Sequence, residues 1–454
     1  MQSDKLNSLE KRTAVSLASV FAIRMLGLFM LMPIMAIYGQ DLEGVSPLWI
    51  GLAIGAYGLT QAMFQIPMGW LSDRYGRKRI IVVGLIIFAI GSVVAGLAED
   101  VVTVTIGRAI QGMGAIASAV LALAADVTRE EQRPKVMAVI GMCIGLSFSV
   151  ALVLGPMVAE SHGLSGVFMF TAVMAVVGIL IVLTLVPNSY TRAKSSEVTA
   201  SPKQVVSMLF DNQLLRLDFG VLVLHLTMTS MFIAVPLLLT KNGVGISEHW
   251  SIYLPVLLLS FIFMVPMIII AAKKGQEKLF FQIGISMLVL ASVVMAMNTD
   301  FWTIVVMLFI FFIGFNFLEA SLPAHVSRLA PAGQKGTAMG VYSSSQFLGA
   351  FLGGISGGYI AESFGFSYLF ASNAALALLW IAYASGMVLP QSSKRVSIPY
   401  EPETQTDTER LIEQISQCDG VVEATVVEDE YRIYLKVDKH GYDSDGVNQI
   451  VTQI

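Results

Sequence analysis

The sequence predicts an all-α membrane protein with twelve transmembrane helices in two six-helix pseudo-repeat bundles, followed by a small α+β domain. Three observations support this fold class. Hydrophobic residues make up 55% of the 454 residues and charged residues only 13%, whereas soluble domains are about 25% charged. Long apolar runs recur along most of the chain. A polar, acidic segment follows the last run. This composition excludes a water-soluble enzyme, a coiled coil and a disordered chain.

Each apolar run is long enough to cross a membrane as a helix. A hydrocarbon core of about 30 Å requires roughly 20 residues, and an isolated strand would leave its backbone groups unpaired in lipid. The runs lie near 13–38, 48–70, 80–98, 102–125, 136–158, 164–186, 215–240, 249–272, 279–297, 302–323, 336–360 and 366–389. We therefore expect an N-terminal bundle over 13–187, a linker rich in Ser, Lys and Pro over 188–214, and a C-terminal bundle over 215–389.

The distribution of Lys and Arg predicts which side of the membrane each loop faces. Loops on one side, together with the N-terminal segment, carry twenty-one Lys and Arg residues, whereas loops on the other side carry only Lys241. Cytoplasmic loops are enriched in these two residues. We therefore expect both termini to lie in the cytoplasm.

The segment after residue 390 has the pattern of a small folded domain. Residues 401–454 contain 13 Asp and Glu against 4 Lys and Arg. Helical spacing and alternation of apolar residues predict its elements. These are strands at 396–400, 421–427 and 431–437 and helices at 406–416 and 443–454. Together, residues 396–454 would resemble a ferredoxin-like domain, here on the cytoplasmic side.

A charged loop between the second and third runs carries the most specific motif. Its sequence is Gly69-Trp-Leu-Ser-Asp73-Arg74-Tyr-Gly76-Arg77-Lys78-Arg79. Gly69 permits close approach of helices, and Gly76 permits a tight turn. Asp73 is an acid among cations, and a helix N-terminus stabilises such a carboxylate by roughly 0.3–1 kcal/mol. Taken alone, these residues also fit a basic cytoplasmic loop with one neutralising acid.

These eleven residues resemble the signature loop of the major facilitator superfamily. Residues 272–278 resemble a reduced copy at the equivalent place in the second half, and residues 335–340 resemble a segment of bacterial members. The resemblance implies a transporter of a bacterial inner (plasma) membrane. It further implies that Asp73 caps the start of the eleventh span and that Arg77 pairs with Asp126 at the end of the fourth. This assembly would latch the two halves together on the cytoplasmic side.

The fourth run contains a second motif. Arg108-Ala-Ile-Gln111-Gly112-Met-Gly114 resembles a signature of proton-coupled members of the superfamily. At a rise of 1.5 Å per residue Arg108 lies about 9 Å inside the membrane, a costly position unless the cation is paired or wetted. Arg108 and Gln111 are three residues apart and share a helix face. The alternative is a structural arginine satisfied by carbonyl groups.

Glycines in the fifth and eleventh runs are predicted to be helix-packing residues. The fifth run resembles the glycine-rich motif of drug/proton antiporters, although Ala159 and Glu160 replace the two glycines that end that motif. Small residues let helices approach closely within a membrane. The predicted packing residues are Gly141, Gly145, Gly155, Pro156, Gly349 and Gly353.

Ionisable side chains within the runs are candidates for a proton and substrate pathway. The superfamily lines its central cavity with the first, fourth, seventh and tenth spans, which here carry Arg24, Arg108, His225 and Glu319. Histidine titrates near neutrality, and burial raises a carboxyl pKa toward that range. His225 and Glu319 are therefore the predicted proton carriers, and the alternative for Glu319 is a structural partner for a nearby arginine. The predicted pathway residues are Arg24, Arg108, Gln111, His225, Asn316 and Glu319.

The leading prediction is a proton-coupled secondary transporter that exports small organic solutes or drugs by alternating access. Many drug/proton antiporters have an acid in the first span, where this chain has Arg24, which argues against cationic drugs. Two alternatives remain open: a proton symporter or uniporter of a sugar or metabolite, and a non-transporting membrane sensor that signals through the C-terminal domain.

The sequence lacks the patterns of an enzyme. It contains no nucleophile–base pair, phosphate-binding glycine loop or cluster of metal ligands, and Cys418 has no second cysteine in a Cys-x-x-Cys pattern. We therefore expect no cofactor, no metal site and no nucleic-acid partner. The expected partners are a small solute, protons and the lipid bilayer. The acidic C-terminal domain contrasts with the basic cytoplasmic loops, which suggests regulation or self-association.

Overall fold

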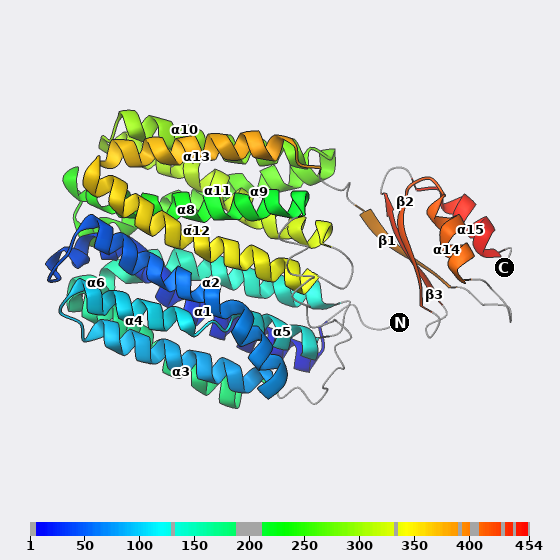
Figure 1. Ribbon diagram of the computed structural model, residues 1–454, viewed down its shortest axis with the longest axis horizontal. Coiled ribbons are helices and arrows are strands. Elements are labelled where there is room, and N and C mark those ends of the chain that lie inside the picture. The colour runs from blue at the N-terminus through cyan, green and yellow to red at the C-terminus, as the bar shows by residue number, and fades with distance from the viewer. Residues whose placement is uncertain are drawn as a thin grey trace. The chain divides into compact units, whose positions relative to one another are not determined.

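The computed structural model describes most of the chain as long helices (Figure 1). The described residues are 6–128, 132–187, 211–330, 335–388, 393–399, 408–427, 432–438 and 442–452. The chain divides into two compact units. The larger comprises residues 1–267 and 280–387, and the smaller comprises residues 268–279 and 388–454.

The first half of the larger unit contains six named helices. They are α1 (Ser8–Tyr38), α2 (Pro47–Tyr75), α3 (Arg77–Gly96), α4 (Val101–Met113), α5 (Ala117–Val127) and α6 (Arg133–Thr184). Residues 114–116 interrupt the fourth predicted span between α4 and α5. Helix α6 turns at Gly163, whose φ of +63° is unfavourable for residues with a Cβ. The turn separates arms over 133–162 and 164–184, which match the fifth and sixth predicted runs.

The second half also contains six helices. They are α8 (Asn212–Lys241), α9 (Trp250–Lys274), α10 (Glu277–Met297), α11 (Phe301–Leu329), α12 (Lys335–Ser363) and α13 (Phe366–Ser385). Short 3₁₀ helices at Gly39–Asp41 and Ile246–Glu248 precede α2 and α9. Helices α1–α6 lie on one side of the bundle and α8–α13 on the other (Figure 1).

Two helix starts repeat between the halves. Asp100 begins α4 and accepts a hydrogen bond from the Thr103 amide at 2.8 Å, and Asp300 begins α11 and accepts one from the Thr303 amide at 2.8 Å. Hydrogen bonds from these threonines hold the pKa of both carboxyls below its ordinary value. Identical caps at equivalent helices fit the predicted relation between the halves.

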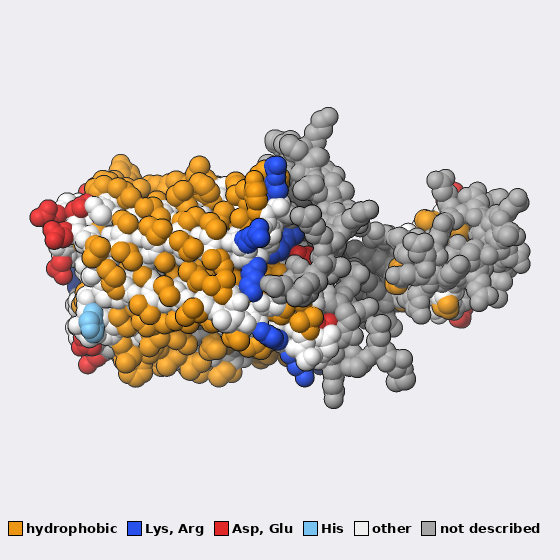
Figure 2. All heavy atoms as spheres, turned by 90° about the horizontal axis from the view of Figure 1, so that it is seen from below, with side chains coloured by type: hydrophobic (Ala, Val, Ile, Leu, Met, Phe, Trp, Pro, Cys, Tyr) orange, Lys and Arg blue, Asp and Glu red, His pale blue; other side chains and the backbone are white. Residues whose placement is uncertain are grey.

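The surface of the helical unit has the charge pattern of a membrane protein. Hydrophobic side chains cover its flank, Lys and Arg gather toward one end, and Asp and Glu gather at the other (Figure 2). We call the end where α2 stops and α3 starts the basic end, and the end where α1 stops and α2 starts the acidic end. In the described residues, nine helical segments are long and apolar enough to cross a membrane.

Three features separate these nine segments from the twelve predicted spans. One of the nine segments covers most of α6, although Gly163 divides that helix, and neither α2 nor α12 is among the nine. Both of these helices are rich in glycine and polar residues, which lower their mean hydropathy. The structure therefore confirms a multi-helix membrane fold.

At the acidic end the two halves are in backbone contact. A Cβ added to Gly51 of α2 would collide with the carbonyl of Gly354 of α12, and a Cβ at Gly55 would lie 2.9 Å from the Phe351 carbonyl oxygen. The Leu48 amide also donates to Glu362 Oε2 at 3.0 Å. The bundle is closed at this end by contacts that leave no room for larger residues.

The smaller unit contains a three-stranded antiparallel sheet. Its elements are β1 (Ser393–Pro399), α14 (Thr408–Ser416), β2 (Val421–Val427), β3 (Arg432–Asp438) and α15 (Ser444–Thr452), in the strand order β1-β3-β2. Alternation along β3 buries Ile433, Leu435 and Val437 and exposes Tyr434. Helices α14 and α15 add Leu411, Ile415 and Val447 to this core. Residues 428–431, which connect β2 to β3, lie outside the described residues.

Candidate functional site

A chain of polar side chains crosses from α1 to α2 in the first half. Arg24 is 1% exposed, and its NH2 group donates to Gln61 Oε1. The Gln61 amide then donates to Gln65 Oε1 at 2.8 Å. The Nε and NH1 atoms of Arg24 are buried and make no hydrogen bond. A buried guanidinium without full pairing is costly, as expected for a functional rather than a structural residue.

A second buried arginine lies close to the first. Arg108 donates through Nε to the Ala53 carbonyl at 3.2 Å and through NH1 to Gln111 Oε1 at 2.7 Å. The Tyr57 ring centroid lies 4.8 Å from the Arg108 guanidinium carbon and 5.9 Å from that of Arg24. The structure thus brings together the predicted Arg24, Arg108 and Gln111 around an aromatic ring that the sequence analysis did not select. The contacts fit cation–π attraction.

The predicted proton carriers form one cluster in the second half. Gln346 of α12 lies between them, with Nε2 2.8 Å from His225 Nε2 of α8 and 3.0 Å from Glu319 Oε1 of α11. His225 Nε2 also lies 3.7 Å from Glu319 Oε2. Glu319 Oε2 is buried without a hydrogen-bond partner. Three helices therefore bring the imidazole of His225 and the carboxyl group of Glu319 together around the Gln346 amide.

The remaining pathway residue lies apart from this cluster. Asn316 donates to Ser260 Oγ of α9 at 2.8 Å. Asn316 and Glu319 share a face of α11, as expected from their spacing, but their side chains contact different helices.

The charged loop brings α2, α3 and α5 together at the basic end. Arg77 Nε lies 3.1 Å from Asp126 Oδ2, and Arg77 NH1 donates to Ser72 Oγ at 2.8 Å. Lys78 donates to the carbonyls of Leu183 and Val186 at the end of α6, where a cation complements the helix dipole. The predicted pairing of Arg77 with Asp126 is thus present as a contact, and its role as a latch remains a proposal.

Other residues of the loop have distinct surroundings. Gly76 has a φ of +101° between α2 and α3, which glycine adopts at no steric cost. A Cβ at Gly69 would lie 3.1 Å from Ser118 Oγ. The Arg74 guanidinium lies 5.7 Å from the ring centroids of both Trp70 and Tyr75. The side chain of Asp73 lies outside the described residues, so its capping of α12 remains a prediction.

Several predicted packing glycines lie at close helix contacts. A Cβ at Gly155 would lie 2.8 Å from the Met30 carbonyl oxygen of α1, and Pro156 lies within α6. Gly349 and Gly353 of α12 contact the backbone of α8. The surroundings of Gly141 and Gly145 lie outside the described residues.

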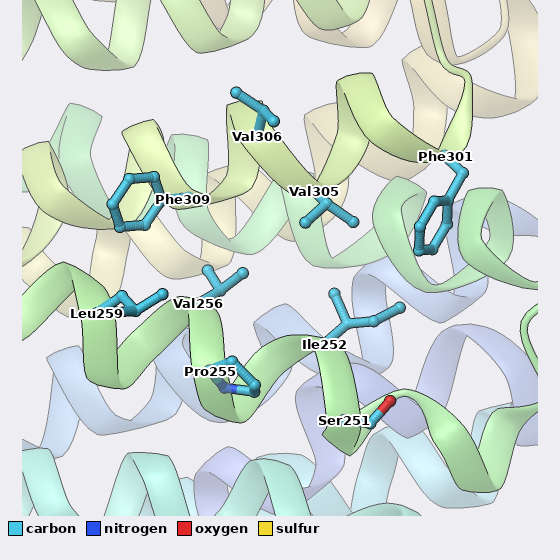
Figure 3. A pocket seen from close by; sticks show the side chains of 9 residues that line it. All are labelled: Ser251, Ile252, Pro255, Val256, Leu259, Phe301, Val305, Val306 and Phe309. Atoms are coloured by element: carbon cyan, nitrogen blue, oxygen red, sulfur yellow. The ribbon is translucent and has the colours of Figure 1, made fainter.

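Two cavities are lined by none of the buried residues Arg24, Arg108, His225 and Gln346. One of about 450 Å³ lies between α9 and α11, where Pro255, Leu259 and Phe309 are among its mainly apolar lining residues (Figure 3). The other, of about 480 Å³, lies at the charged loop between Tyr75 and Leu183. Within the described residues, no group of three or more His, Cys, Asp or Glu is arranged to hold a metal.

Comparison with known families agrees with this architecture. The family model of the major facilitator superfamily matches residues 17–353 and 257–417. The chain belongs to the major facilitator superfamily. It is therefore a member of a family of transporters and not an enzyme.

Curated relatives and solved structures support this assignment. The inner membrane transport protein YajR of Escherichia coli is 42% identical over 456 residues, which cover all of both chains. The quinolone resistance protein NorA of Staphylococcus aureus is 24% identical over 78% of this chain and 91% of its own length. The structure of the nucleoside transporter NupG shares the fold, with a TM-score of 0.66 and 13% identity over 82% of this chain and 99% of that chain.

Proposed function

We propose that this chain is a proton-coupled secondary transporter that exports a small organic solute by alternating access. The observation that carries the proposal is the cluster of His225, Gln346 and Glu319, which joins α8, α11 and α12. A carboxyl and an imidazole in contact can bind a proton in one conformation and release it in another. Helices of one half that share such a site can couple its protonation to their movement.

The proposed architecture has twelve spans and a cytoplasmic basic end. The nine candidate segments become twelve when the arms of α6 are counted separately and α2 and α12 are added. Helices α2 and α12 pack on each other through glycine. The excess of Lys and Arg at one end supports the proposal that this end faces the cytoplasm, and we propose that both termini lie on the same side. The inner-membrane name of the YajR relative supports this location.

The charged loop is the proposed conformational latch. Arg77, Asp126 and Ser72 connect α2, α3 and α5 at the basic end, which makes the loop one rigid unit. We propose that Asp73 then binds the start of α12 when the cytoplasmic side closes. The backbone contacts at the acidic end would open in the same step.

The charge of the buried site favours a neutral or anionic solute over a cationic one. Arg24 and Arg108 are both buried, and in the described residues neither forms an ion pair with a carboxylate. Such a site repels a cation. The quinolone resistance in the name of the NorA relative supports an organic compound as the solute.

Transport in reconstituted vesicles tests the proposal. A screen of organic compounds in an efflux-deficient host first identifies a solute whose accumulation falls when the chain is expressed. Vesicles with an internal pH dye then report proton movement when that solute is added. If the chain exchanges the solute for protons, protons move in the direction opposite to the solute. The Glu319→Gln substitution should abolish this proton movement. Proton movement in the same direction would favour a symporter, and solute flux without proton movement a uniporter.

The smaller unit is proposed to be a ferredoxin-like domain with a regulatory or self-association role. Three antiparallel strands packed with α14 support that layout. Deleting residues 391–454 should change the transport rate or the oligomeric state. If solute flux is absent in the intact chain, a sensor that acts through this domain becomes the better description. If deletion changes neither property, the regulatory role is wrong.

A further inference from the structure

Arg24 of α1 has donor groups that no acceptor satisfies in the described residues. Its side chain is 1% exposed, and its Nε and NH1 atoms are buried without a hydrogen-bond partner. Its NH2 group donates to Gln61 Oε1. A guanidinium group keeps its charge and carries five N–H donors and no acceptor. The unpaired nitrogens of Arg24 therefore need an acceptor that a ligand can supply.

A second buried cation adds to the positive charge around these donors. Arg108 of α4 is also 1% exposed. The Tyr57 ring centroid lies 4.8 Å from the guanidinium carbon of Arg108 and 5.9 Å from that of Arg24. Arg108 already donates through Nε to the Ala53 carbonyl and through NH1 to Gln111. Two positive charges thus share one aromatic ring, and Arg24 is the one with buried, unpaired donors.

The acids of this half do not neutralise the two arginines. Glu10 lies about 21 Å from Arg24 along the axis of α1, and Asp126 of α5 is paired with Arg77. Within the part of the chain that the structure describes, no carboxylate forms an ion pair with Arg24 or Arg108. A buried charge without a counter-ion is costly. The charge balance therefore favours a bound anion.

This arginine group lies beside the contact between the two halves. The Tyr57 ring centroid is 6.5 Å from that of Phe347 of α12. Phe347 directly follows Gln346, which contacts both proton carriers. An anion bound in the first half and a proton bound in the second would therefore lie on either side of the same α2–α12 contact. Both sites can respond to the movement that separates these helices.

We propose that Arg24 binds a carboxylate group of the exported solute, which is therefore an organic anion. The carboxylate supplies the acceptors that Arg24 Nε and NH1 lack, together with the negative charge that the two buried cations require. A neutral solute would leave both charges without a counter-ion. Gln61, whose amide donates to Gln65 at 2.8 Å, positions the Arg24 guanidinium.

The site is enclosed in the conformer described, so the solute enters when the helices move apart during alternating access. This inference rests on the proposed function and narrows its solute from a neutral or anionic molecule to a carboxylate.

Thermal unfolding of the full-length chain in detergent micelles tests the site without a proton gradient. Sodium carboxylates from acetate to benzoate are compared with their amides, which have a similar shape and no charge. Sodium chloride and sodium phosphate are added at the same ionic strength as further comparisons. A ligand that binds the folded chain raises the unfolding temperature as its concentration exceeds Kd. We expect at least one carboxylate to give a saturating rise that its amide does not give.

Substitutions at Arg24 and Gln61 assign this response to the site. Arg24→Gln should weaken the apparent affinity for the carboxylate about tenfold or more, which corresponds to about 1.4 kcal/mol. Arg24→Lys should keep a weaker response, because lysine keeps the charge but not the planar set of donors. Arg216→Gln is the matched control. Arg216 lies in α8 of the other half and also has a buried, unpaired Nε, and its loss should leave the response unchanged.

Gln61→Glu places a carboxylate of the chain itself beside Arg24. It should abolish the response to added carboxylate and raise the unfolding temperature of the ligand-free chain, because Arg24 gains a paired charge. This variant keeps Arg24, so it decides the question if Arg24→Gln does not fold. A full response in Gln61→Glu or in Arg24→Gln would overturn the site.

The remaining outcomes separate this inference from the proposed function. No rise with any carboxylate, an equal rise with the amides, or a rise with phosphate or chloride alone would overturn the carboxylate site. If the carboxylate response is present but vesicles show no proton movement with the solute, the proton coupling fails and the site stands. If protons move in exchange for a solute while no carboxylate response is present, the site alone is wrong.

Discussion

Replacing Gly51 of α2 with alanine should open the acidic end of the bundle. The new Cβ would collide with the Gly354 carbonyl oxygen and would lie 2.8 Å from its carbon, about 0.6 Å inside the 3.4 Å at which ordinary contact begins. Because these atoms belong to the backbone of α12, the two helices must separate. Overpacking of this kind costs about 1–3 kcal/mol.

The same substitution also has a favourable part. Alanine is about 1 kcal/mol better than glycine inside a helix, but α2 is helical in both conformers, so this gain does not offset the cost of about 1–3 kcal/mol to the conformer that is closed at the acidic end. This cost changes the ratio of conformers about 5- to 150-fold. Gly340→Ala of α12 is the matched control, because nothing lies within 4 Å of its added Cβ.

Distances between spin labels measure this ratio. Labels at Gln40 and Ser363, one from each half at the acidic end, are attached after Cys143 and Cys418 are replaced by serine. We expect Gly51→Ala to increase the population with the longer distance and Gly340→Ala to leave it unchanged. A distance distribution in Gly51→Ala equal to that of the control would refute the packing argument.

Three further changes test separate parts of the molecule. Asp126→Asn should weaken the contact with Arg77 by about 0.5–1 kcal/mol and change the conformer ratio about two- to fivefold. Distances between spin labels at the basic end measure this ratio. An unchanged ratio would reject the latch. Asp300→Ala should speed amide exchange in the first turn of α11 several-fold. Because the pKa of Asp300 is lowered in the folded chain, the ionised cap stabilises α11 above the ordinary carboxyl pKa, and this stabilisation is lost as the pH falls through the lowered pKa. Amide exchange rates in Asp300→Ala that equal those of the wild type at neutral pH would contradict the role of the cap. Leu435→Ala should destabilise the smaller unit by about 2–5 kcal/mol and expose it to protease, whereas equal protease resistance would argue against the described core.

The sequence predicts the helices well because hydrophobic length is a local property. The run at 215–240 corresponds to α8 at Asn212–Lys241, and the division between the fifth and sixth runs falls at Gly163. The break at 114–116 was not predicted, because Gly114 is equally compatible with a continuous helix in a tightly packed bundle.

The candidate site is less predictable because contacts between helices depend on tertiary packing. Helical spacing places Asn316 and Glu319 on one face, but only the structure shows that Asn316 bonds to Ser260. The sequence analysis did not select Asp218, which is buried in α8 with 6% exposure, because an acid near the start of an apolar run has the pattern of a boundary residue. Its position seven residues before His225, on the same helix face, was the signal that would have identified it.

The central claim is that protonation of the His225–Glu319 cluster sets the balance between conformers. The most direct measurement is the conformer ratio, from labels at Gln40 and Ser363, as pH is varied from about 5 to 8, the range in which histidine changes charge. We expect the ratio to change with pH in the wild-type chain and to become independent of pH in Glu319→Gln. A ratio that does not respond to pH in the wild type, or that responds equally in Glu319→Gln, would contradict proton coupling through this cluster.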